Sequence, residues 1–149
     1  MGDESRTMLR SLVSFFLVLS ALSGVSALSA NSVTVSDCNP ASILKITGLS
    51  FSPDVPVPGQ NGTLSTHYDV PYEITKGVAK YTCTLNGLPV LSESYDLCTQ
   101  TVCPIAAGHH DDTSESAVPV VGGTLSCKIK WEDEAAQPLL CIQTKMLLG

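Results

Sequence analysis

The chain has 149 residues and a formal net charge of −6. Its only two arginines, Arg6 and Arg10, lie near the start, so the remainder of the chain is acidic and free of arginine. This balance excludes the basic surface that nucleic-acid binding needs, and we expect no nucleic-acid partner. The length suits a single domain.

The first thirty residues have the organisation of a signal peptide. Residues 11–30 carry no charge, and their apolar centre at 12–22 has the length of a signal-peptide core. Val25-Ser26-Ala27 fits the cleavage pattern, and Leu28-Ser29-Ala30 fits it less well. We therefore expect residues 1–27 to be a signal peptide, cleaved after residue 27 or 30, and residues 31–149 to form the mature domain. An uncleaved membrane anchor is the alternative, since twenty uncharged residues just suffice to span a bilayer.

Beyond residue 40, short stretches alternate apolar and polar side chains with the period of two that is typical of β-strands. In the clearest of them, 123–131, Leu125, Cys127, Ile129 and Trp131 alternate with polar residues. Asn86-Gly87 indicates a tight hairpin turn. We expect a polar loop at 109–116 and an extended Pro/Gly-rich connection at 51–63. Six or seven strands follow from the pattern, in 42–51, 62–70, 78–87, 88–94, 123–131 and 138–148.

Six cysteines in the expected mature domain indicate a disulfide framework if the chain is exported. Cys98 and Cys103 lie only five positions apart, so a zinc knuckle or a redox pair is the alternative to a small bridge. A structural zinc site needs four ligands, usually in two close pairs, and a redox pair is usually Cys-x-x-Cys at a helix start. Neither pattern is present, which favours a small structural disulfide. Spacing alone leaves fifteen connectivities open among Cys38, Cys83, Cys98, Cys103, Cys127 and Cys141.

Loop-closure entropy ranks two of these bridges. A Cys38–Cys141 bridge would close about 100 residues and stabilise the fold by about 4.7 kcal/mol in the chain-entropy model. A Cys98–Cys103 bridge would contribute roughly 2 kcal/mol by the same relation. The first would join the two ends of the domain, and the second would fix the shape of one loop.

The stretch DLCTQTVCPI, residues 96–105, resembles the Asp-x-Cys…Cys-Pro-Ile/Val element of ML domains. This MD-2-related lipid-recognition family includes the Niemann-Pick C2 sterol carriers and the phosphatidylglycerol/phosphatidylinositol transfer proteins. NGLPVLSESYDLC (86–98) resembles the family's Gly-x-Pro-Val segment, and GGTLSCKIKW (122–131) and PLLCIQTKMLL (138–148) resemble its last two strands. The likeness covers Cys38 to Leu148.

The resemblance implies an all-β, immunoglobulin-like sandwich of two antiparallel sheets with an internal lipid cavity, stapled by bridges Cys38–Cys141 and Cys98–Cys103. It implies a lipid-binding and lipid-transfer protein that carries a phospholipid or a sterol, has no cofactor, contacts membranes transiently and acts as a monomer. Such a protein is secreted or resides in the lumen of a vacuole or lysosome. Ser92 departs from the sterol carriers, which tend to have an aromatic residue there, and this favours a phospholipid or another lipid over a sterol.

Cys83 and Cys127 also depart from the common family pattern. Both lie in the middle of expected strands, on the apolar side. They form a third bridge or remain as buried thiols, which pack as small hydrophobic side chains. We favour the bridge, because secreted proteins rarely retain two free thiols.

The candidate cavity residues come from two sources. Strand alternation supplies apolar side chains that share a face, and the resemblance supplies the segments nearest the ligand portal, 87–90 and 118–120. Each of these side chains would serve equally well in an ordinary sandwich core. The set is Ile46, Tyr68, Tyr81, Leu85, Val90, Val118, Pro119, Val120, Leu125, Ile129 and Trp131.

We expect neither catalytic residues nor a metal. The sequence lacks a Gly-x-Ser-x-Gly elbow and a Gly-rich phosphate loop. His109, His110, Asp111 and Asp112 offer metal ligands, but consecutive ligands in a polar segment are typical of a solvated loop. An extracellular recognition protein that acts through a protein partner is the alternative function, since the fold alone does not exclude it. Asn61-Gly62-Thr63 is an N-glycosylation sequon, so we expect a glycan on Asn61.

Overall fold

The computed structural model describes residues 31–149, so the expected signal peptide lies outside the described residues. Within them, no helix has the length and apolar character that crossing a membrane requires. Eight strands and one short helix form the fold: β1 (Ser32–Asp37), β2 (Lys45–Ser52), β3 (Asn61–Val70), β4 (Val78–Leu85), β5 (Leu88–Asp96), α2 (Leu97–Gln100), β6 (Gly108–Ala117), β7 (Gly123–Glu132) and β8 (Pro138–Leu148).

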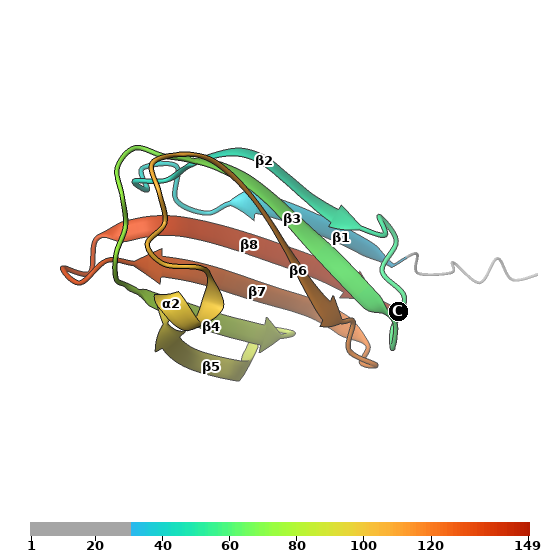
Figure 1. The fold of residues 1–149 in the computed structure, drawn as a ribbon. Helices are drawn as coiled ribbons and strands as arrows, with labels where there is room; N and C mark the ends of the chain where they lie inside the picture. The colour runs from blue at the N-terminus through green and yellow to red at the C-terminus, as the bar shows by residue number, and fades with distance from the viewer. Residues whose placement is uncertain (1–30) are drawn as a thin grey trace, which may run out of the picture.

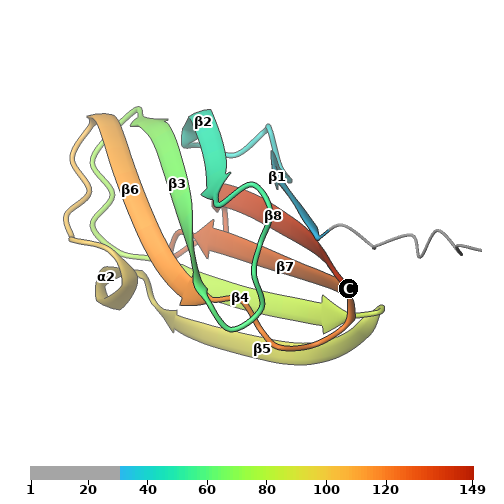
Figure 2. The same cartoon turned by 90° about the vertical axis from the view of Figure 1, so that its right-hand side faces the viewer.

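The strands form two antiparallel sheets that face each other (Figure 1). The larger sheet has the order β1-β8-β7-β4-β5, and the smaller has the order β2-β3-β6. The sheets approach each other at β1 and β2 and diverge toward β5 and β6 (Figure 2). The predicted two-sheet sandwich is therefore confirmed, and its wide side lies between two edge strands.

Residues 109–116 belong to strand β6, so the prediction of a loop there is wrong. This segment pairs with β3 over ten residues, from Val70 opposite Gly108 to Asn61 opposite Ala117. As an edge strand on the wide side of the sandwich, β6 is largely exposed on both faces. Charged residues are common on such strands because they discourage pairing with other chains. The backbone ladder forms without the apolar alternation that sequence reasoning relied on.

The alternation found in the sequence elsewhere matches the burial of the side chains. Along β3, Leu64, Thr66, Tyr68 and Val70 all point inward and are buried. The predicted hairpin turn is also present: Asn86 and Gly87 both have positive φ, 51° and 82°, as the tightest hairpin turns require. Strand β1, which the sequence analysis did not anticipate, pairs with β8 along its whole length.

All six cysteines are bridged. Cys38 pairs with Cys141, Cys98 with Cys103, and Cys83 with Cys127. The first two are the bridges that the resemblance implies, and the third is the bridge favoured for the two mid-strand cysteines. Cys83 and Cys127 lie directly opposite each other on the neighbouring strands β4 and β7.

The Pro/Gly-rich connection between β2 and β3 is shorter than predicted and spans residues 53–60. Asn61, the residue of the sequon, is the first residue of β3 and is exposed rather than part of a turn. Its accessibility suits a glycan, and glycosylation stays a prediction.

Candidate functional site

A cavity of about 800 Å³ lies between the two sheets. Inward side chains of β3 from the smaller sheet and of β4, β7 and β8 from the larger sheet form most of its wall. This volume falls within the roughly 300–1,000 Å³ of small-molecule sites. Each of these strands turns one face toward the cavity. Alternate residues along a strand share a face, so the period-two pattern of the sequence makes the interior apolar.

Six of the eleven predicted cavity residues line this cavity, and five do not. The six come from both sheets and from the β6–β7 connection: Tyr68, Tyr81, Pro119, Leu125, Ile129 and Trp131. The five that lie outside the wall are Ile46, Leu85, Val90, Val118 and Val120.

A break in the strand register explains one of these differences. Ile46 lies opposite Tyr68, ahead of a bulge in β2, and packs against the core, while Phe51 further along β2 reaches the wall. An irregularity between β4 and β5 places Leu91, not Val90, opposite Cys83. Val90 is consequently 56% exposed. A bulge inserts one unpaired residue and re-aims the side chains around it, which strict alternation cannot anticipate.

The three predicted residues of the β6–β7 connection, 118–120, lie in three different environments. Val118 is buried, and its backbone N–H and C=O bond to the 53–60 connection, to Gln60 O and Gly59 N, both at 2.8 Å. Pro119 then reaches the cavity wall, and Val120 is 79% exposed. Val118 therefore holds the connection in place and does not line the cavity.

Sequence reasoning missed two parts of the wall. The inward face of β8, from Leu140 to Met146, lines the cavity, although its alternation was visible in the sequence. Residues 112–117 of β6 also line it, and they carried no apolar signal at all. The side of the cavity nearest β6 is consequently rich in hydroxyl and carboxylate groups.

A few polar groups are set into the apolar interior around Tyr68. The Tyr68 hydroxyl donates to Asp112 Oδ2 at 2.6 Å, and its ring packs edge-on against Trp131 at a centroid distance of 6.1 Å. Burial, together with the Asp112 carboxylate, raises the pKa of Tyr68 far above its ordinary value. The phenol therefore remains a hydrogen-bond donor at any physiological pH.

Trp131 presents a buried donor beside the cavity. Within residues 31–149 its indole Nε1–H has no hydrogen-bond partner, although the ring lines the cavity. The nearby Tyr81 hydroxyl donates instead to Gln100 Oε1 at 3.1 Å. Burial raises the pKa of Tyr81, and the neighbouring Trp131 indole opposes that shift. A buried donor without a partner costs about 1–3 kcal/mol, so a ligand oxygen at this point would be favoured.

Two of the three disulfides adjoin the cavity. Cys83 and Cys127 themselves form part of the wall. The Cys98–Cys103 bridge closes the loop whose residues 100–102 also line the cavity. The loop begins with the one-turn helix α2, in which Asp96 Oδ1 accepts from Cys98 N at 2.8 Å. The small bridge thus fixes a segment of the wall.

The family model described as ML domain matches residues 32–148. A Dictyostelium discoideum protein assigned as phosphatidylglycerol/phosphatidylinositol transfer protein 3 is 33% identical over 106 residues, which cover 69% of this chain and 67% of that protein. The phosphatidylglycerol/phosphatidylinositol transfer protein of Mycosarcoma maydis is 27% identical over 117 residues, 72% of this chain and 61% of that protein. The chain thus spans roughly two thirds of the length of these relatives.

Solved structures share the fold. The crystal structure of chicken MD-1 complexed with lipid IVa has a TM-score of 0.60 at 17% identity and covers 83% of this chain and 94% of its own. The Niemann-Pick type C2 protein from the Japanese carpenter ant has a TM-score of 0.59 at 13% identity, with coverages of 75% and 96%.

Proposed function

This chain belongs to the ML-domain family, and on that premise we propose that it binds one lipid between its two sheets and transfers it between membranes. The observation that carries the proposal is the cavity of about 800 Å³ lined by the inward faces of both sheets. Each methylene removed from water into such a space is worth about 0.8 kcal/mol. The chain is a carrier and not an enzyme.

We propose a phospholipid as the cargo. The two relatives described above are named for phosphatidylglycerol and phosphatidylinositol transfer, and one of them is 33% identical to this chain. The polar side chains of β6, from Asp112 to Ser116, offer hydrogen-bond partners at one side of a cavity that is elsewhere mostly apolar. This asymmetry suits a molecule with apolar chains and a polar headgroup better than a sterol with a single hydroxyl.

We further propose that the lipid is exchanged during brief contact with a membrane. Two aliphatic side chains near the wall are exposed: Val102, 84% exposed, lines the cavity within the disulfide loop, and Val120, 79% exposed, follows Pro119. Apolar side chains at these positions can enter the interface of a bilayer without unfolding the sandwich. The three disulfides favour secretion or the lumen of a vacuole or lysosome, because such bridges persist in oxidising compartments.

Vesicle transfer tests the proposal with a matched pair of variants on strand β7. Ile129→Trp places a large ring inside the cavity, whereas Lys130→Trp places the same ring on the exposed side of the same strand. Fluorescent phosphatidylglycerol should move between vesicles with the wild type and with Lys130→Trp, and much more slowly with Ile129→Trp. Equal transfer by all three proteins would contradict a cargo held in this cavity. Failure of the wild type to transfer any lipid, together with capture of a protein partner, would favour the recognition function instead.

A further inference from the structure

Two His-x-Asp triplets lie side by side on the outer face of the smaller sheet. His67 and Asp69 belong to β3, and His109 and Asp111 belong to β6. Residues two apart on a strand share a face, and the register places His67 opposite Asp111 and His109 opposite Asp69. The four side chains therefore form a square with the two histidines on one diagonal. The pleat also divides residues 109–112 between the two faces of β6, because His110 and Asp112 point to the other face.

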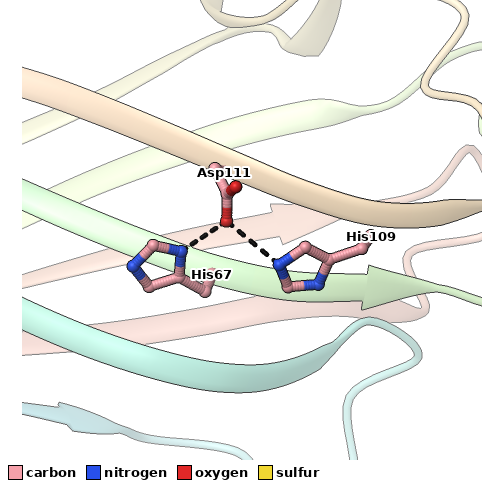
Figure 3. Close-up of side chains that lie close together, drawn as sticks. All are labelled: His67, His109 and Asp111. Carbon is pink, nitrogen blue, oxygen red and sulfur yellow. Dashed lines mark hydrogen bonds and ion pairs between the residues drawn. The ribbon is translucent and has the colours of Figure 1, made fainter.

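Three of these side chains converge on one point (Figure 3). His67 Nδ1 and His109 Nε2 both contact Asp111 Oδ1, the latter at 3.1 Å. One ligand atom from each of the three residues lies within 4.8 Å of the other two. With metal–nitrogen bonds of about 2.0–2.1 Å, a tetrahedral zinc ion holds its ligand atoms roughly 3.3 Å apart. Exposed side chains can close the remaining distance by small rotations.

The surroundings orient the two rings. Asp69 Oδ1 accepts from His109 Nδ1 at 2.8 Å, which directs the other ring nitrogen of His109 toward Asp111. A carboxylate that holds a histidine in this manner is the usual outer partner of a metal-bound imidazole. On the other side, Gly48 of β2 leaves room for the His67 ring, since a Cβ there would lie 2.9 Å from His67 Cδ2. The two rings are parallel to within 2°.

We propose that His67, His109 and Asp111 bind one zinc(II) ion, with Asp69 orienting His109 and water completing the coordination. Two imidazoles and one carboxylate are a zinc ligand set that keeps a position open, whereas calcium and magnesium prefer oxygen ligands. The ion joins β3 to the edge strand β6, whose residues 112–117 line the cavity. It thereby cross-links a strand that forms part of the cavity wall.

Calorimetric titration of the secreted, chelator-stripped mature chain with zinc chloride tests the proposal, provided that the protein carries no polyhistidine tag. One zinc ion per chain should bind saturably, and calcium chloride should give no comparable binding. His67→Asn and His109→Asn should each abolish measurable binding. Asp69→Ala should lower the affinity roughly 10- to 100-fold, as loss of an outer partner does.

His110→Asn is the matched control. It removes a histidine from the same strand, but His110 Nε2 contacts Ala106 O at 2.7 Å on the other face. Its zinc affinity should equal that of the wild type. Absence of wild-type binding would overturn the proposal, as would equal affinity of the His67→Asn variant. X-ray absorption of the zinc-loaded wild type gives an answer that does not depend on folding of the variants: two imidazole ligands support the site, and a shell without them overturns it.

Discussion

Removal of the Cys83–Cys127 bridge should destabilise the protein about twice as much as removal of the Cys98–Cys103 bridge. The bridges close segments with sequence separations of 44 and 5 residues. The chain-entropy relation converts these loops into about 4 kcal/mol and about 2 kcal/mol of stabilisation, respectively. The strands β4 and β7 stay joined by their hydrogen-bonded ladder in the Cys83→Ala/Cys127→Ala double variant, so we expect it to fold and to keep the cavity.

Urea unfolding followed by far-ultraviolet circular dichroism measures the difference. The Cys83→Ala/Cys127→Ala variant should lose about 4 kcal/mol of unfolding free energy, which corresponds to a fall in Tm of roughly 15 °C for a domain of this size. The Cys98→Ala/Cys103→Ala variant should lose about half as much free energy. If removal of the small bridge lowered the unfolding free energy by as much or more, the loop-closure reasoning would be refuted. Interactions within the folded state, and not loop entropy, would then dominate the stabilisation.

Three further outcomes follow from the structure. In Gly62→Ala the new Cβ would lie 2.1 Å from Phe51 Cζ, so the ring should be displaced and the fold destabilised by about 1–3 kcal/mol; an unchanged urea midpoint would contradict this packing. Val120→Glu should slow transfer between vesicles while leaving the amount of bound lipid unchanged, and an unaltered rate would exclude Val120 from membrane contact. The hydrogen bond to Asp69 raises the pKa of His109 above 6.5, so this pair stabilises the fold fully below pH 6.5 and less as the pH rises through the raised pKa. NMR titration of metal-free protein should show the raised pKa, and Asp69→Ala should lower it; an identical pKa in both proteins would disprove the cause.

The sequence predicted most of the architecture because burial on one face leaves a period-two record. Strand β8 begins at Pro138 and ends at Leu148, the bounds that alternation indicated, and Leu125, Ile129 and Trp131 of β7 all reach the cavity wall. Two of the disulfide pairings came from the family resemblance, and the Cys83–Cys127 pairing came from the rarity of free thiols in secreted proteins, since cysteine spacing alone left the connectivity open.

The errors of prediction lie where the backbone departs from regular alternation or where a strand is exposed to solvent on both faces. Val90 lies next to a register shift between β4 and β5, so Leu91 occupies the inward position that was expected for Val90. Nothing in strand β6 is apolar enough to mark an inward face, so the sequence predicts a loop there. The same error concealed the cluster of His67, His109 and Asp111, since His67 is brought beside Asp111 only by the β3–β6 register.

Native mass spectrometry of the secreted protein, followed by extraction and identification of any bound lipid, shows directly whether the space between the sheets holds a lipid. We expect one lipid per folded chain, and a glycerophospholipid rather than a sterol after extraction. The Ile129→Trp variant should be empty, and Lys130→Trp should be as fully occupied as the wild type. A wild-type chain that remains empty after incubation with phosphatidylglycerol and phosphatidylinositol vesicles would contradict a lipid cargo in this cavity.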